Sequence, residues 1–245
     1  MSSFQLYKGD CLELLPDIIS THEIHAVIVD PPYGTTKEHW DSPIDLGTMW
    51  NELSLLPKPI PVLLFGQEPF SSKLRLSNIK DYRYDIYWEK ERITNIMQVK
   101  RRPGKVIENI SVFYKAQPTY NPQMVQYTGP ARTNKIKDGR FGRLVDTRST
   151  KPYNYNDIGL RYPTQHIKFK RDIFKSNLHP TLKPVALLEY LINTFTNPGD
   201  TVLDFCAGSG STGIACLNTG RNFIGIELDD HYFTVMEDRL NNHKI

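Results

Sequence analysis

The four residues Asp30-Pro31-Pro32-Tyr33 combine a carboxylate, two rigid proline positions and an aromatic ring. The prolines fix the backbone and remove two amide hydrogens, so the Asp30 carboxylate and the Pro31 carbonyl are presented as hydrogen-bond acceptors. Such a turn suits a ligand that brings donors, and the exocyclic amino group of a nucleobase is one. We expect Asp30 to accept one N–H, the Pro31 carbonyl to accept the other, and Tyr33 to stack on the base.

This arrangement would withdraw both amino hydrogens from conjugation and leave the nitrogen lone pair available to attack an electrophilic methyl group. An amino group on an aromatic ring is a poor nucleophile, so its orientation must supply most of the rate acceleration. The reaction requires neither a metal nor a covalent intermediate. A base in a duplex must first be extruded, and stacking on an aromatic side chain returns ~1–3 kcal/mol of that cost.

A second candidate site is the glycine-rich segment from Gly208 to Gly213, which matches the pattern Gly-x-Gly-x-x-Gly between an expected strand and an expected helix. Glu227 follows at the end of the next expected strand, where its carboxylate can accept both hydroxyl protons of a ribose. These residues predict a nucleoside-bearing cofactor. Only 32 residues follow Gly213, too few for the rest of a dinucleotide-binding fold, so N-terminal strands must complete the sheet.

The elements that position these residues are short apolar strands alternating with helices. The helix that follows Asp10 is expected to stop at Pro16, and Pro184 is expected to open another. The pattern predicts a doubly wound parallel sheet. The expected strands are residues 4–8, 24–29, 61–65, 84–89, 110–115, 201–203 and 222–226, and the expected helices are 11–15, 184–195, 214–217 and 229–240.

The order of these strands predicts which chain ends meet. The strand that ends at Asp10 should lie beside the strand that ends at Glu227, and the strand that ends at Asp30 beside the one that ends at Asp204. Both candidate sites then share one carboxyl edge, where open α/β sheets bind their ligands.

Positive charge is concentrated in residues 116–178. This stretch holds twelve Lys or Arg, four Asp and no Glu, a net charge of +8, and the rest of the chain carries −5. Tyrosines, phenylalanines and polar amides are interleaved with the cations, which suits phosphate neutralisation and base contacts. Composition alone also allows an ordinary solvated loop region.

The whole chain of 245 residues is long enough for a large domain with one insertion. It contains no apolar run of the ~18 residues that a membrane span requires, and its start does not resemble a signal peptide, so we expect a cytoplasmic protein. Three cysteines without Cys-x-x-Cys spacing predict reduced thiols, with no metal site and no disulfide.

Together these motifs resemble the permuted beta-group of S-adenosylmethionine-dependent DNA amino-methyltransferases, and the resemblance covers nearly the whole chain. The matching segments are the Asp30 turn, His179-Pro180-Thr181-Leu182-Lys183-Pro184, and residues 204–212. The resemblance implies an α/β fold, a circularly permuted Rossmann-like methyltransferase sheet with an inserted basic target-recognition lobe. It divides the chain into a catalytic half (1–115), a target-recognition insertion (116–178) and a cofactor-binding half (179–245).

The resemblance also implies roles for individual residues. Asp10 would reach the cofactor's adenine, Glu227 would hold its ribose, and Lys183 would face the methionine end. The expected catalytic residues are Asp30, Pro31, Pro32 and Tyr33, and the expected cofactor-binding residues are Asp10, Lys183, Asp204, Gly208, Ser209, Gly210, Ser211, Thr212 and Glu227. From the distribution of charge, the expected DNA-binding residues are Lys100, Arg101, Arg102, Arg132, Lys135, Arg140, Arg143 and Arg148, with a solvated charge run as the alternative for Lys100, Arg101 and Arg102.

Two positions depart from the family pattern, since Leu182 replaces a glutamine and Phe205-Cys206 replaces a Pro-Phe pair. Asp at position 30 resembles the enzymes that methylate the N6 amino group of adenine in double-stranded DNA, whereas those acting on cytosine more often carry Ser. The alternatives are methylation of the cytosine N4 amino group, methylation of RNA, or a catalytically inactive nucleic-acid-binding protein. The family implies a restriction-modification or phage role. The sequence leaves open the recognition site, whether a cognate restriction endonuclease exists and whether the protein forms a homodimer.

Overall fold

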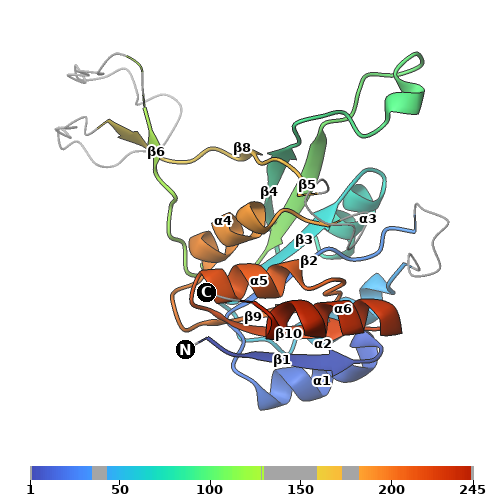
Figure 1. Cartoon of the computed structure of the whole chain (residues 1–245), viewed down its shortest axis with the longest axis vertical. Coiled ribbons are helices and arrows are strands. Elements are labelled where there is room, and N and C mark those ends of the chain that lie inside the picture. The colour runs from blue at the N-terminus through green and yellow to red at the C-terminus, as the bar shows by residue number, and fades with distance from the viewer. Residues whose placement is uncertain (1, 35–42, 128, 130–158, 173–181, 244–245) are drawn as a thin grey trace. The chain divides into compact units, whose positions relative to one another are not determined.

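The computed structural model describes residues 2–34, 43–127, 129, 159–172 and 182–243. In these residues an eight-stranded sheet has the order β1-β10-β9-β2-β3-β5-β4-β8, with helices on both of its faces (Figure 1). The strands are β1 (Phe4–Lys8), β2 (Ala26–Val29), β3 (Val62–Gly66), β4 (Tyr82–Glu89), β5 (Ile107–Phe113), β8 (His166–Lys168), β9 (Thr201–Asp204) and β10 (Asn222–Glu227). The helices are α1 (Cys11–Thr21), α2 (Leu46–Leu53), α3 (Phe70–Ser77), the 3-10 turn η1 (Ile96–Gln98), α4 (Val185–Phe195), α5 (Ser211–Asn218) and α6 (Asp230–Asn241).

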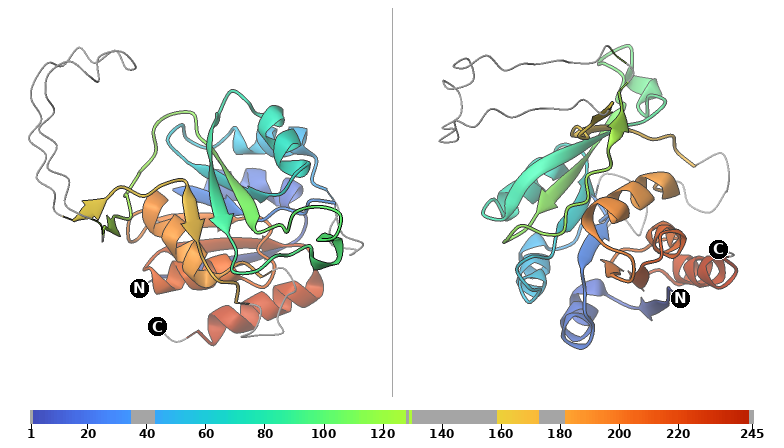
Figure 2. Two further views of the ribbon diagram at one scale, coloured as in Figure 1. Left: turned by 90° about the horizontal axis from the view of Figure 1, so that it is seen from above. Right: turned by 90° about the vertical axis from the view of Figure 1, so that its left-hand side faces the viewer.

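Two hydrophobic clusters hold the layers together, one on each face of the sheet. Helices α4, α5 and α6 pack on one face, and α1, α2 and α3 pack on the other (Figure 2). Neighbouring residues of one strand pack in different clusters, so that Leu63 of β3 belongs to one and Leu64 to the other. Because both faces are covered, β2 and β3 are apolar and buried along their whole length, which is the pattern of strands buried on two sides.

The predicted meeting of distant segments is confirmed. Strand β1 pairs in parallel with β10, so that Lys8 lies opposite Glu227. Strand β2 pairs in parallel with β9, and Val27 lies opposite Leu203. The carboxyl ends of these four strands therefore lie at one edge of the sheet, and the residues that follow them are brought together there.

The expectation of a fully parallel sheet is wrong at β5. This strand runs antiparallel to both β3 and β4, between which it lies. It follows β4 through residues 90–106, which contain only the short turn η1 and no crossover helix that could return the chain to the other end of the sheet.

The helix after Asp10 also differs from its prediction, because α1 continues through Pro16 to Thr21. Proline inside a helix removes one backbone hydrogen bond and costs about 3 kcal/mol. Leu15 and Ile18 lie in the core on either side of Pro16, and their burial offsets that cost. Helices α2 and α3 were not expected from the sequence, nor was β8.

The described residues divide into two compact units, one of residues 1–121 and 164–245 and a second of Pro122–Pro163. The second unit contains a two-stranded ribbon of β6 (Val125–Gln126) and β7 (Leu160–Arg161), in which the Arg161 guanidinium lies 4.2 Å from the centre of the Tyr127 ring. The predicted insertion, 116–178, has wider boundaries than this unit. Strand β8 lies within that range and yet pairs with β4 in the main sheet, where Ile167 is buried.

None of the helices among the described residues is both long and apolar enough to span a membrane.

Candidate active site

A pocket of about 890 Å³ lies at the carboxyl edge of the sheet, a size suited to a nucleoside ligand together with a base. The Asp30 turn and the Gly208 turn both line it, although they are far apart in the sequence. From the first half of the chain its walls include Gly9, Asp10, Cys11, Asp30, Pro31, Pro32, Tyr33, Gln67, Lys90, Thr94 and Glu108. From the second half they include Leu182, Lys183, Asp204, Cys206, Gly208, Ser209, Ser211, Thr212, Glu227, Asp229 and Tyr232.

The glycine-rich turn connects β9 to α5 along one wall of this pocket. Gly208 has φ +52°, and a Cβ added there would meet no atom within 4 Å, so its backbone faces open space. Gly210 has φ +78°, and a Cβ there would lie 2.8 Å from the Met236 side chain of α6. Glycine is therefore required at 210 for both conformation and packing, and at 208 it leaves the backbone accessible to a ligand.

Glu227 links three segments of this wall by hydrogen bonds. One carboxylate oxygen accepts a hydrogen bond from the Gly208 N–H at 2.7 Å, and the other accepts one from the Asp229 N–H at 2.8 Å. Its backbone carbonyl accepts from the Gly9 N–H at 3.1 Å. A carboxylate oxygen has two lone pairs, so each can still accept a hydroxyl proton from a diol.

Asp204, at the end of β9, is buried beneath the turn. It accepts hydrogen bonds from the Thr212 hydroxyl at 2.6 Å and from the Cys206 N–H at 3.1 Å. Burial raises the pKa of Asp204 to about 7, because these two bonds offset only part of the lost hydration. Through these hydrogen bonds Asp204 fixes the conformation of the turn.

The Asp30 turn lines the same pocket, directly after β2. The Tyr33 hydroxyl donates to Asp30 Oδ1 at 2.5 Å, and the Tyr33 ring lies against Phe70 with the ring centres 5.1 Å apart. Burial, together with the Asp30 and Glu108 carboxylates, raises the pKa of Tyr33 well above its ordinary value. Tyr33 is thus a neutral hydrogen-bond donor that orients the Asp30 carboxylate.

A cluster of buried charged side chains adjoins Asp30, and it was not expected from the sequence. Lys183 Nζ is paired with Asp30 Oδ2 and lies 3.1 Å from Glu108 Oε1. Lys90 Nζ lies 2.5 Å from Glu108 Oε2, and the Glu108 side chain is only 2% exposed. The signal that could have revealed the cluster is a glutamate inside the mostly buried strand β5, since a buried charge needs a partner.

The charges in this cluster stabilise one another. Burial alone would raise the pKa of Glu108, but Lys183 and Lys90 lower it to about 2. Burial likewise lowers the pKa of Lys183, but Asp30 and Glu108 more than offset this and raise it above its ordinary value. Burial raises the pKa of Asp30, and the Lys183 ammonium opposes that rise.

The other predicted site residues occupy different kinds of positions. Asp10 is the N-cap of α1, where its carboxylate accepts from the Leu12 N–H at 2.8 Å, and it also lines the pocket. Lys183 lies against Asp30, and its contact with the methionine end of a cofactor stays a prediction. Lys100, Arg101 and Arg102 are exposed between β4 and β5. The predicted DNA-binding residues Arg132, Lys135, Arg140, Arg143 and Arg148 lie outside the described residues.

The residues present fit a nucleoside cofactor with a charged amino-acid tail. The open Gly208 backbone, the Glu227 carboxylate and the serines and threonine at positions 209, 211 and 212 line the pocket together. Within the described part of the chain, no three His, Cys, Asp or Glu side chains gather in an arrangement that could hold a metal ion.

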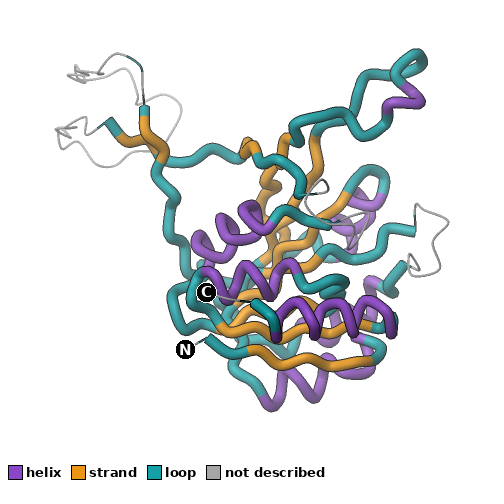
Figure 3. Tube along the Cα trace, viewed as in Figure 1, coloured by secondary structure: helices purple, strands orange, loops and turns teal. Residues whose placement is uncertain are grey.

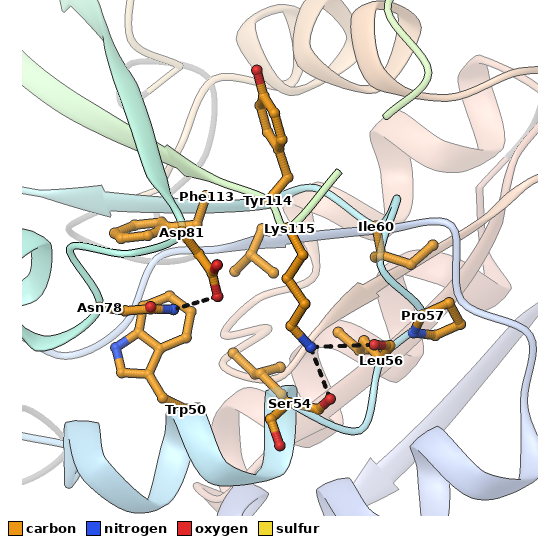
Figure 4. Close-up of a pocket in the computed structure, with 12 residues that line it drawn as sticks. Trp50, Ser54, Leu56, Pro57, Ile60, Asn78, Asp81, Phe113, Tyr114 and Lys115 are labelled. Carbon is orange, nitrogen blue, oxygen red and sulfur yellow. Dashed lines mark hydrogen bonds between the residues drawn. The ribbon is translucent and has the colours of Figure 1, made fainter. Parts of the chain in front are cut away.

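A smaller hollow of about 40 Å³ lies elsewhere, between α2 and the ends of β3 and β5 (Figure 4). Lys115 Nζ extends into it and donates to the carbonyls of Ser54, at 2.8 Å, and Leu56, at 3.4 Å, just after the end of α2. A space of this size holds no more than a water or two. The hollow is therefore too small for a ligand, and Lys115 binds carbonyl groups at the end of α2 there.

The α/β fold, with the Asp30 turn and the Gly208 turn lining one large pocket, is that of an enzyme of the methyltransferase class. The sequence model of a family described as DNA methylase matches residues 24–238. The chain therefore belongs to the DNA methylase family, and the predicted fold and enzyme class are confirmed.

Individual relatives agree with this assignment. The DNA adenine methyltransferase YhdJ of Escherichia coli strain K12 is 28% identical over 252 residues, which cover 96% of this chain and 82% of that protein. The Type II methyltransferase M1.MboII of Moraxella bovis is 26% identical and covers 98% of both chains. The crystal structure of an M1.HpyAVI-SAM complex superposes with a TM-score of 0.66 at 27% identity and covers 97% of this chain and 99% of that one.

Proposed function

We propose that this protein transfers a methyl group from S-adenosylmethionine to the N6 amino group of an adenine that is flipped out of double-stranded DNA. The observation that carries the proposal is that the Asp30 turn and the Gly208–Glu227 wall line one pocket. An acceptor turn for an amino group and a site for a nucleoside cofactor are the two halves of this reaction, and here they share one cavity.

On the cofactor side, Glu227 accepts the ribose hydroxyls, Asp10 faces the adenine end, and the turn from Gly208 to Thr212 approaches the remainder. When bound, S-adenosylmethionine supplies a methyl group on a sulfonium sulfur, which keeps the bonding electron pair. The protein's contribution is orientation, because Asp204 and Arg239 hold the turn in one shape. Arg239 donates to the Ser209 carbonyl at 2.6 Å.

On the substrate side, Asp30 and the Pro31 carbonyl accept the two hydrogens of the target amino group, and Tyr33 packs against the base. Each Asp30 oxygen has one lone pair engaged, by Tyr33 or by Lys183, and one left for the substrate. Lys183 acts through Asp30 as a positioning residue, since it fixes the carboxylate and favours its charged form, and Glu108 in turn fixes the Lys183 ammonium.

The electrons and protons balance without a further reactant. The amino nitrogen contributes the electron pair of the new N–C bond and thereby acquires a surplus proton. Asp30 is hydrogen-bonded to that nitrogen, and burial raises its pKa, so its carboxylate can take the proton and pass it to water.

The choice of adenine rests on the aspartate at position 30 and on the relative YhdJ, which is named an adenine methyltransferase. Residues 116–178, with their excess of positive charge, are proposed to read the target sequence. The Type II relative M1.MboII supports a place in a restriction-modification system with a cognate endonuclease. The cytoplasm, where bacterial DNA lies, is the proposed place of action.

The test is a methylation assay with labelled cofactor and duplex DNA, followed by digestion to nucleosides and mass spectrometry. We expect N6-methyladenine from the wild-type protein and from Asp17→Ala, an exposed aspartate on α1, and none from Asp30→Ala. N4-methylcytosine as the only product would overturn the choice of base. Label on RNA alone would overturn the choice of nucleic acid, and binding of DNA and cofactor without transfer would show a catalytically inactive protein.

A further inference from the structure

The segment of residues 90–106, between β4 and β5, carries an unusual combination of side chains at its tip. Met97 is 94% exposed and Ile96 is 67% exposed, both in the 3-10 turn η1. The segment extends beyond the sheet as a long excursion of mostly loop structure with this one helical turn (Figure 3). We call residues 90–106 the β4–β5 arm.

Hydrogen bonds hold the arm in a defined conformation, and this conformation exposes its tip. The Lys90 N–H donates to the Val106 carbonyl at 2.8 Å, and the Thr94 N–H donates to the Lys105 carbonyl at 2.9 Å. Asn95 Oδ1 accepts from the Lys105 N–H at 2.6 Å, which links the two sides of the arm just below its tip. These bonds hold η1 at the end of a braced loop.

The base of the arm belongs to the active-site wall. Lys90 and Thr94 line the large pocket, and Lys90 is paired with Glu108 in the charge cluster behind Asp30. Strand β4 ends at the carboxyl edge of the sheet, where Asp30 follows β2. The tip therefore extends from the same edge at which the target base must enter.

The tip is also cationic. Lys100, Arg101 and Arg102 follow η1 after Val99, and all three are exposed. Isolated exposed hydrophobic residues are ordinary, but two neighbouring ones on a projecting turn with a cationic flank match the surfaces that insert into DNA. In such surfaces the cations hold phosphates while apolar side chains enter between base pairs.

Resting on the proposed function, we propose that Ile96 and Met97 form an apolar wedge that enters the duplex beside the target base and fills the space which that base leaves on flipping. Extrusion of a base breaks its stacking on both neighbours, and an apolar side chain in the gap restores part of that contact. Lys100, Arg101 and Arg102 would bind the flanking phosphates and set the depth of entry. The wedge acts on the flipping equilibrium and touches neither the cofactor nor the reacting nitrogen.

The experiment compares two duplexes that carry the recognition site, mapped beforehand from DNA methylated by the wild-type protein. In one duplex the target base is paired, and in the other it faces an abasic position and is already destabilised. The test variant is the double substitution Ile96→Ala and Met97→Ala. The matched control is Leu76→Ala, which removes a 73% exposed leucine from α3.

We expect the double variant to lose about tenfold or more in single-turnover methylation of the paired duplex and to recover most of that loss on the abasic duplex, because the flipping cost is already reduced there. A target-site 2-aminopurine should show a smaller fluorescence increase with the double variant than with the wild type. The salt dependence of DNA binding should not change, whereas Lys100→Ala should reduce its slope by about 0.9. The Leu76→Ala protein should match the wild type.

Equal losses on the two duplexes, or no loss on the paired one, would overturn the wedge. Failure of the proposed function has a different signature, because the wild-type protein itself would then methylate neither duplex.

Discussion

Glu108→Gln removes the negative charge that holds Lys90 and Lys183 behind Asp30. Glutamine keeps the shape of the side chain and one acceptor oxygen, but it leaves Lys90 without the carboxylate with which it is paired and Lys183 with Asp30 alone. Breaking a buried ion pair from one side typically costs about 3–5 kcal/mol. The pKa of Glu108 gives a similar figure, because its fall from an ordinary 4.5 to about 2 is equivalent to about 3 kcal/mol of stabilisation at neutral pH.

The pH dependence of this loss follows from the direction of the shift. A carboxyl group whose pKa is lower in the folded state contributes stability above its unfolded pKa and loses that contribution as pH falls through the folded value. The difference between wild type and Glu108→Gln should therefore be full at pH 7 and should shrink as pH falls below about 4.5 towards 2.

The assay is urea unfolding at several pH values between 7 and the acid limit of the folded protein. The matched control is Glu237→Gln, at an exposed position on α6, which should unfold like the wild type. Adding Lys90→Met to Glu108→Gln should restore part of the lost stability, because it removes one unpaired ammonium. A variant that stays within about 0.5 kcal/mol of the wild type at neutral pH, or a deficit that does not change with pH, would refute this account of the cluster.

Three further substitutions separate the roles of the pocket residues. Asp30→Ala should abolish methyl transfer and leave the cofactor dissociation constant unchanged by calorimetry, and a lost cofactor affinity would mean that Asp30 is wrongly placed. Glu227→Ala should weaken cofactor binding about 10- to 100-fold, since two hydroxyls lose a charged acceptor, and unchanged affinity would contradict the ribose assignment. Asp204→Asn keeps one acceptor oxygen for the Cys206 N–H and turns the other contact round, with its amide donating to the Thr212 hydroxyl oxygen. It removes an acid whose pKa is raised to about 7, so the folded wild-type protein loses that group's stability as pH rises from about 4 to 7. The advantage of Asp204→Asn should grow over that range in unfolding experiments, and a constant difference would count against the raised pKa.

Much of the site could be predicted because its framework is simple. Continuous apolar runs indicate strands buried on both faces, and the carboxyl ends of parallel strands meet at one edge. The Asp30 turn and Glu227 could therefore be placed together before any coordinates were known. The same reasoning missed the direction of β5, because direction depends on the connection and not on the strand's own residues.

The charge cluster could not be predicted in the same way. Lys183 and Asp30 are 153 positions apart, and no local pattern shows that their side chains meet. Pro16 shows the opposite limit of sequence reasoning. A local rule predicts that the helix ends at this proline, but the helix continues to Thr21 because Leu15 and Ile18 pack in the core. Exposure of Met97 is likewise a tertiary property, invisible in a segment that reads as an ordinary polar loop.

The most direct test of the central claim is a crystal structure of the protein with a non-reactive cofactor analogue and a duplex that contains the recognition site. We expect the analogue's ribose on Glu227 and an extruded adenine on Asp30, with the amino nitrogen about 3–3.5 Å from the position of the transferable methyl carbon. An analogue bound away from Glu227, or an adenine that remains stacked in the duplex while the Asp30 pocket holds no base, would contradict the account.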